Sequence, residues 1–263
     1  LAVLWLIDKV IIHDKKTQLM DVFSLPDDEW SRMVNIQLSN FENRPFQPPT
    51  LPSGDIVETS SHSDEEHEKV VNRIQDSIRS GQVYQVNFGR RWSGDLLSHP
   101  SDVFDRLTID NPAPFSAYLE AEDIGFALAS SSPETLLRCN GDIVNTAPIK
   151  GTCPRGRSSE EEELLRIEML ADEKERSEHR MLVDLMRNDL SEVCSVDSVK
   201  VERFDVEVYA DVQHLVSHIK GSILPDTNGI NAIQSIFPGG SITGCPRTVV
   251  CAAIDQLEQQ SRS

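Results

Sequence analysis

The chain has 263 residues, of which 38% are hydrophobic and 26% are charged, and its formal net charge is −18. This composition is that of a soluble globular protein, with enough chain for one large domain or two small ones. The negative charge argues against nucleic acid and anionic membranes as partners, and an anionic substrate would need a local lysine, arginine or metal ion.

The five cysteines are odd in number and include no CxxC pair. We therefore expect neither a disulfide framework nor a zinc site. We expect a reducing, cytoplasmic location. The apolar run from Leu1 to Ile7 is too short to cross a bilayer and lacks the layout of a signal peptide. Because the chain starts with leucine and stops just after a helical pattern, we expect both ends to be cut.

The first part of the chain predicts two strands within residues 1–25, joined by a turn at 14–16, and then a proline-rich linker over 40–62. A helix is predicted next. It opens at Ser63, because the three acidic residues that follow suit the helix dipole, and it runs to about Arg79.

The rest of the chain alternates between strands and helices. Strand-like segments are predicted at 82–91, 115–119, 125–129, 135–139, 143–147, 199–203 and 212–219. Helices are predicted at 102–109, from 158 to about 190 as one long helix or two in sequence, and from about 245 to 257. Strands in hairpins with helices grouped between them predict an α+β fold built on antiparallel sheet.

Lys150 is the first candidate for chemistry, because it ends a predicted strand between Pro148 and Gly151. Glycine lets the backbone approach a ligand closely, and a partly buried lysine can serve as a nucleophile. The alternative is an ordinary solvated lysine on the surface.

Glu134 precedes the strand that pairs with the one leading to Lys150. With a two-residue turn at Asn140-Gly141, Glu134 would lie opposite Ala147, and Lys150 would point to the other face. With a longer turn or a bulge, Glu134 would lie opposite Pro148 and share a face with Lys150. A carboxylate that simply ends a strand is the alternative.

Glu178 falls on one predicted helix face with Met181, Leu182 and Leu185. A carboxylate on an apolar face needs a partner. Lys174, one turn earlier, could supply it; the other interpretation is a magnesium ligand, because Mg²⁺ takes one or two carboxylates and leaves room for a substrate oxygen.

His214 and His218 have the spacing of a helical metal pair, but their neighbours alternate as in a strand. On a strand they would be about 13 Å apart and could not share an ion. A lone histidine there is either structural or a proton carrier. The segment 237–244 is rich in glycine and precedes a helix, so its backbone N–H groups could hold a carboxylate, unless it is only a helix entry.

Taken in order, these segments resemble the chorismate-using enzymes, which include anthranilate synthase component I and aminodeoxychorismate synthase component I. The matching stretches are Tyr84-Gln85-Val86-Asn87, Ala113-Pro114-Phe115-Ser116, Ser132-Pro133-Glu134, Pro148-Ile149-Lys150-Gly151-Thr152, Val183-Asp184-Leu185-Met186-Arg187-Asn188-Asp189, His214-Leu215-Val216-Ser217 and Pro238-Gly239-Gly240-Ser241-Ile242-Thr243-Gly244. The resemblance implies a two-layer antiparallel β-sandwich with peripheral helices. Residues 1–62 would be a remnant of the N-terminal part with a linker, and 63–263 the catalytic domain without its C-terminal part.

The resemblance also implies roles for individual residues. Lys150 would be the nucleophile, Glu134 the general acid and base, and Glu178 one of two carboxylates for Mg²⁺. The expected contacts with chorismate are Gly151, Thr152, His214, Gly240, Ser241 and Thr243. Pro114, Phe115 and Ser116 match a segment that in relatives helps to bind tryptophan.

Lys150 separates branches of the family, because anthranilate synthases typically carry alanine there. The resemblance therefore favours synthesis of 4-amino-4-deoxychorismate, a precursor of para-aminobenzoate and folate, with ammonia from a glutaminase subunit. Alternatives are anthranilate synthase, an isochorismate-type enzyme whose essential lysine lies elsewhere, and a non-catalytic module that binds chorismate or tryptophan.

Two departures from the family pattern stand out. Cys245-Pro246-Arg247 replaces the usual Ala-Pro-Lys, which retains a cation. Relatives continue well past this end with the second magnesium carboxylate, so the 263-residue chain alone is expected to be inactive.

Overall fold

The computed structural model describes residues 7–26, 28–40, 47, 49–51, 58–258 and 260–262. The chain forms two compact units, residues 1–47 and 48–263. The predicted proline-rich linker lies largely outside the described residues. None of the described helices combines the length and the apolar character that a bilayer span requires.

The first unit contains the predicted hairpin and one helix that was not predicted. Strands β1 (Val10–Asp14) and β2 (Leu19–Phe23) pair antiparallel, and the Asp14 carboxylate accepts a hydrogen bond from the Lys16 N–H at 2.8 Å in the turn. Helix α1 (Glu29–Ser39) starts at Asp28, whose carboxylate accepts from the Trp30 N–H at 2.7 Å. The local capping signal was therefore present in the sequence.

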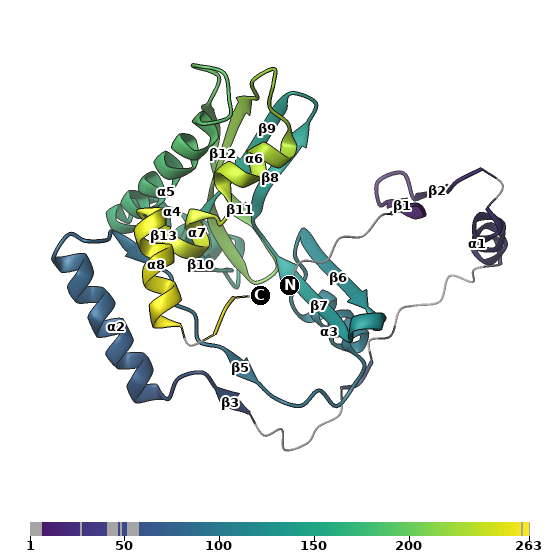
Figure 1. Cartoon of the computed structure of the whole chain (residues 1–263), viewed down its shortest axis with the longest axis horizontal. Coiled ribbons are helices and arrows are strands. Elements are labelled where there is room, and N and C mark those ends of the chain that lie inside the picture. The colour runs from purple at the N-terminus through teal and green to yellow at the C-terminus, as the bar shows by residue number, and fades with distance from the viewer. Residues whose placement is uncertain are drawn as a thin grey trace. The chain divides into compact units, whose positions relative to one another are not determined.

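A five-stranded antiparallel sheet forms the centre of the second unit (Figure 1). Its strands are β8 (Thr135–Asn140), β9 (Ile143–Ala147), β10 (Ile149–Pro154), β11 (Lys200–Val208) and β12 (Val212–Ser222). Strand β12 pairs with β11 along one edge and with β10 and then β9 along the other, and β8 lies beyond β9. The α+β prediction is confirmed.

Two consecutive helices cover one face of this sheet (Figure 1). Asp172 ends α4 (Ser159–Ala171) and caps α5 (Glu173–Ser191), which settles the predicted choice in favour of two helices. The residues of β12 that are buried include Leu215, Val216 and Ile219, and Ile219 belongs to the core cluster that also contains residues of α5. The main core cluster is Val144, Leu182, Val183, Met186, Leu190, Cys194, Ile219, Ala232 and Ile236.

Shorter elements surround this centre. They are β3 (Thr59–Ser60), α2 (Asp64–Arg79), β4 (Gln85–Val86), β5 (Trp92–Ser93), α3 (Pro100–Asp110), β6 (Phe115–Ala121), η1 (Glu122–Ile124), β7 (Phe126–Ser132), α6 (Gly229–Ile236), α7 (Gly240–Thr243), β13 (Gly244–Cys245) and α8 (Arg247–Leu257). Helix α2 matches its prediction, with Ser63 and Glu66 forming a capping box. The predicted strand at 82–91 is wrong in extent, because only Gln85 and Val86 form a strand there, β4, which pairs with β13.

Arg247 ties α8 to α5. Its guanidinium forms an ion pair with the carboxylate of Asp189, which is buried, and donates to the Ser235 carbonyl at 2.6 Å. The cation expected after the cis Cys245–Pro246 bond is therefore used to neutralise a buried charge.

Replacing Arg247 by methionine is expected to lower the free energy of unfolding by about 3 kcal/mol, because it leaves the Asp189 carboxylate buried without its cation. Arg247→Lys should cost much less. Chemical denaturation measures both. The control is Arg187→Met, which breaks an exposed pair with Asp184 at 3.3 Å and should cost less than about 1 kcal/mol. Equal losses for Arg247→Met and Arg187→Met would contradict this account.

Candidate functional site

A β-bulge sets the position of Glu134. The hairpin turn is Gly141-Asp142, since Asn140 pairs with Ile143, and the register shifts by one residue on β8 before Thr135 pairs with Ala147. Continuing that register places Glu134 opposite Pro148. This is the bulged arrangement that the sequence required for Glu134 and Lys150 to share a face.

The carboxylate of Glu134 replaces a missing sheet partner. Pro148 lies between β9 and β10 and has no N–H to donate. Strand β8 starts only at Thr135, which pairs with Ala147, so β8 has no strand residue opposite Pro148 and Ile149. Glu134 Oε1 accepts the next backbone N–H, from Ile149, at 3.1 Å, and the hydroxyl of Ser241 also bonds the carboxylate. Burial raises the pKa of Glu134 despite these two bonds, which oppose the shift. Glu134 is thus suited to hold a proton.

A second bulge lies at Lys150 and Gly151. Ile149 pairs with Val216 and Thr152 with His214, so β10 carries one extra residue there. Gly151 has a φ of 102°, and a Cβ on it would lie 2.7 Å from Leu215 Cδ1, so only glycine fits. Bulges of this kind re-aim side chains beside active sites.

The amine of Lys150 lies 3.3 Å from Glu178 Oε2 on α5. Lys174 Nζ reaches Glu178 Oε1 at 3.9 Å, so the predicted helix pair also forms. The side chains of Lys150 and Glu178 are 32% and 34% exposed, which places the pair at the edge of the core, open to solvent. Lys150 is thus partly buried and ion-paired, and its role as a nucleophile stays a prediction. Among the described residues, the ion pair of Lys150 is with Glu178 and not with Glu134.

The predicted inner face of α5 was wrong by a small rotation about the helix axis. Leu182 is buried as expected, but Glu178, Met181 and Leu185 are only half-buried. The buried face is formed by His179, Leu182, Val183, Met186, Asp189 and Leu190. Because Glu178 lies at the rim of this face, its carboxylate can meet Lys150 without being fully desolvated.

His179 was missed by the sequence reasoning. Its Nδ1 lies 3.1 Å from the carbonyl oxygen of Lys150 and its Nε2 lies 2.7 Å from the hydroxyl of Ser217. Burial lowers the pKa of His179, against the hydrogen bond to Lys150. Its position four residues before Val183 and seven before Met186 was a helical signal that could have identified it.

His214 and Thr152 are brought together across β10 and β12, with His214 Nδ1 2.9 Å from Thr152 Oγ1. Burial lowers the pKa of His214. The ring of Tyr209, also missed, lies edge-on to His214 with 5.2 Å between centroids. These three side chains form one polar wall next to Gly151.

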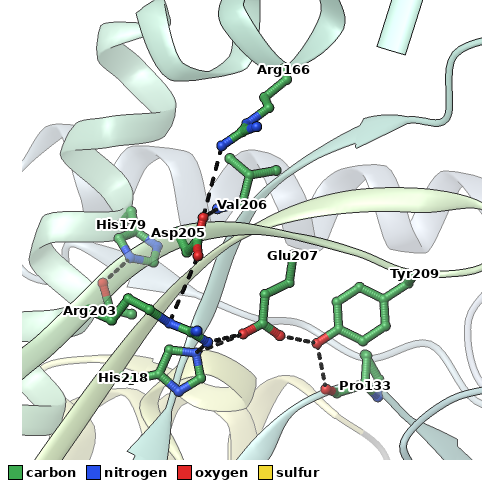
Figure 2. Close-up of polar contacts among 10 residues, drawn as sticks. Pro133, Arg166, His179, Arg203, Asp205, Val206, Glu207, Tyr209 and His218 are labelled. Carbon is green, nitrogen blue, oxygen red and sulfur yellow. Dashed lines mark hydrogen bonds and ion pairs between the residues drawn. The ribbon is translucent and has the colours of Figure 1, made fainter. Parts of the chain in front are cut away.

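Glu207 joins Tyr209 to His218 (Figure 2). The Tyr209 hydroxyl donates to Glu207 Oε2 at 3.0 Å and lies 3.4 Å from the Pro133 carbonyl oxygen. His218 Nε2 lies 2.7 Å from Glu207 Oε1. His218 therefore has its own partners, Glu207 and Arg203, and the prediction that His214 and His218 do not share an ion on a strand agrees with this geometry.

The glycine-rich segment packs directly on α5. A Cβ on Gly240 would lie 2.1 Å from Leu185 Cδ2, so glycine is needed for the close approach. Ser241 faces Glu134, whereas the Thr243 hydroxyl donates to the Gly239 carbonyl at 3.0 Å and is buried. The N–H groups of residues 242 and 243 also bond that carbonyl, so an anion contact at this segment stays a prediction.

The segment predicted to bind tryptophan lies in a separate two-stranded sheet of β6 and β7. Phe115 pairs with Ser132 and is 37% exposed, and the Ser116 hydroxyl donates to the Ala113 carbonyl at 2.9 Å. Pro114 lies just before β6. Tryptophan binding by Pro114, Phe115 and Ser116 stays a prediction.

The donor set at Glu178 fits a magnesium ion in part. Within the described ranges, no three His, Cys, Asp or Glu side chains lie close enough to hold a metal together. Mg²⁺ keeps several waters and uses one or two carboxylates, and Glu178 is a half-exposed carboxylate that already attracts two ammonium groups. Magnesium binding by Glu178 therefore stays a prediction.

The chain is similar to several known proteins. It is 36% identical over 260 residues to aminodeoxychorismate synthase component 1 of Bacillus subtilis (strain 168), covering 98% of this chain and 53% of that protein. It is 43% identical over 193 residues to "Anthranilate synthase component 1 3" of Haloarcula marismortui, covering 73% and 38%. Anthranilate synthase component I of Streptococcus pneumoniae TIGR4 superposes with a TM-score of 0.80 at 28% identity, covering 96% and 57%.

The chain thus spans about half the length of these relatives or less. The sequence model of the family described as "chorismate binding enzyme" matches residues 1–263. The chain therefore belongs to the chorismate binding enzyme family.

Proposed function

We propose that the protein aminates chorismate to 4-amino-4-deoxychorismate through a covalent adduct on Lys150, in the formation of para-aminobenzoate for folate. The observation that carries this proposal is the setting of Lys150. Its amine lies at the edge of the core on a glycine bulge, 3.3 Å from Glu178, with Glu134 on the neighbouring strand. The family resemblance supports the same choice, because it leads us to expect alanine at this position in an anthranilate synthase.

Before the first step, the Lys150 ammonium that pairs with Glu178 loses one proton to solvent. In the first step, the resulting free amine forms a bond from Nζ to C2 of chorismate. The ring double bonds shift, the C4–O bond breaks, and the protonated carboxyl of Glu134 gives its proton to the departing oxygen, which leaves as water. The raised pKa of Glu134 supports this role, because it keeps the carboxyl protonated to higher pH than that of an exposed glutamate.

In the second step, ammonia attacks C4, the double bonds shift back, and the C2–Nζ bond breaks, which releases Lys150 as a neutral amine. The new ammonium group at C4 returns a proton to the Glu134 carboxylate, so both residues regain their starting states. Mg²⁺ at Glu178 would hold the ring carboxylate, and His214, Thr152 and the backbone at Gly151 would contact the substrate. A glutaminase subunit would supply the ammonia.

The test is a mass spectrum of the full-length protein incubated with chorismate and Mg²⁺ but without ammonia. An adduct of chorismate minus water is expected on the peptide that contains Lys150. No adduct, together with a Lys150→Ala variant that still makes an aminated product, would reduce Lys150 to a positioning cation.

Anthranilate synthesis is the second candidate, because the Haloarcula relative is 43% identical over the part it matches. The two reactions share chorismate and ammonia but differ in product. Anthranilate is fluorescent and has lost the pyruvyl group, so mass and fluorescence of the product separate the two reactions.

A further inference from the structure

Two consecutive residues of α5 hold the two ends of Lys150. Glu178 reaches the side-chain amine at 3.3 Å, and His179 reaches the backbone carbonyl oxygen at 3.1 Å. The side chain and the backbone carbonyl of Lys150 thus both contact the same turn of α5. Figure 2 shows His179 reaching from α5 toward the sheet.

The hydrogen-bond partners determine which nitrogen of His179 carries the proton. A carbonyl oxygen can only accept, so Nδ1 must carry the hydrogen that bonds Lys150. Nε2 then accepts from the Ser217 hydroxyl at 2.7 Å. Both His179 and Ser217 are buried, with 3% and 2% of their surface exposed, so both bonds are largely shielded from bulk solvent.

This anchor lies where the sheet is least constrained. Between the Ile149 and Thr152 pairings, the Lys150-Gly151 bulge is out of register with β12, and Gly151 adopts a conformation open to few other residues. The ladder on its own therefore leaves the peptide plane after Lys150 without its regular partner. The imidazole of His179 supplies a partner from the helix above.

We propose that His179 is a positioning residue, which orients the Lys150 nucleophile by donating from Nδ1 to the Lys150 carbonyl. The proposal rests on the nucleophilic role of Lys150 proposed above. In this proposal His179 acts through Lys150 and not by contact with the substrate. Its effect is to hold the backbone from which Lys150 projects, so its loss should slow attack on the substrate without weakening substrate binding.

Two isosteric variants separate the bonds of His179. The amide nitrogen of asparagine occupies the place of Nδ1, and that of glutamine the place of Nε2. His179→Asn can therefore keep the bond to Lys150 and lose the one to Ser217, whereas His179→Gln does the reverse. His179 and Ser217 border a cavity of about 340 Å³ with Val183, Val201 and Phe204, so either amide has room.

In the full-length protein, His179→Gln is expected to slow formation of the Lys150 adduct and lower kcat by about 10- to 100-fold with KM nearly unchanged. His179→Asn should stay within about threefold of the wild type, at a similar melting temperature. Ser217→Ala, which leaves the Lys150 bond in place, should behave like His179→Asn. Equal effects of the Asn and Gln variants would overturn the proposal.

Two measurements keep the proposal testable if a variant does not fold or if no adduct forms. Nitrogen-15 NMR of histidine in the wild-type protein should show hydrogen on Nδ1 of His179, and hydrogen only on Nε2 would overturn the proposal. Acetylation of Lys150, measured relative to Lys174 by peptide mapping, should change in His179→Gln and not in His179→Asn. Failure of the adduct in the wild type with these results intact would count against the proposed function alone.

Discussion

Replacing Lys150 by alanine is expected to lower kcat for amination of chorismate by at least about 100-fold, because the amine that bonds C2 is removed. KM for chorismate should change less, since Glu134, Thr152 and His214 still line the site. Steady-state kinetics of the full-length protein with ammonia as nitrogen donor measures both constants. Using free ammonia makes the result independent of a glutaminase partner.

Lys174→Ala is the matched control for Lys150→Ala. Lys174 reaches the same carboxylate, Glu178, but at 3.9 Å and with a side chain that is 78% exposed. Removing it deletes one positive charge near the site without touching the bulge at Gly151, and kcat should fall less than about threefold. If Lys174→Ala and Lys150→Ala lowered kcat equally, the function of Lys150 would be electrostatic, and the covalent route would be wrong.

Glu134→Gln is expected to lower kcat by about 100- to 10,000-fold, because glutamine keeps the hydrogen-bonding shape but cannot give a proton to the departing C4 oxygen. The pH profile should identify the group. Burial raises the pKa of Glu134, so the wild-type rate of adduct formation should fall on the alkaline side as the pH passes this raised value. The residual rate of the glutamine variant should lack that alkaline decline.

Stability provides an independent reading of the same pKa shift. Folding favours the protonated form of Glu134, so the free energy of unfolding should decline as the pH rises from the ordinary glutamate pKa through the raised one. Glu134→Gln should remove this decline, whereas Glu122→Gln, at an exposed position in η1, should leave both the decline and kcat unchanged. If the free energy of unfolding of Glu134→Gln declined with pH as it does in the wild type, the decline would belong to another titratable group.

Local signals in the sequence were sufficient for many elements. Helix α2 could be predicted because Ser63, Glu66 and the stop at Ser80-Gly81 act within a few residues of each other. The chain reversal near Asn140-Gly141 was predicted for the same reason, and the structure moves it by one residue to Gly141-Asp142. Helix α6 (Gly229–Ile236) was missed although Asn228 caps it, because its eight residues are too few to show a clear period.

The candidate site was predicted by residue type but not by arrangement. Lys150, Glu134 and Glu178 stand out in the sequence, and the resemblance to chorismate-using enzymes depends on motifs that include them. Their partners could not be derived locally. Ser241 lies over a hundred residues from Glu134, and the rotation of α5 that puts Glu178 at the rim and His179 in the core depends on what the helix packs against.

Composition, the antiparallel α+β class, most element positions and the family are thus readable from the chain alone, because they depend on contacts between near neighbours and on residue identity. The pairing of Lys150 with Glu178, the anchoring of its carbonyl by His179 and the placement of Glu134 beside Ile149 arise only on folding. Each depends on a one-residue bulge or a helix rotation. Such features follow from packing between distant segments, since a register shift of one residue turns a side chain to the opposite face.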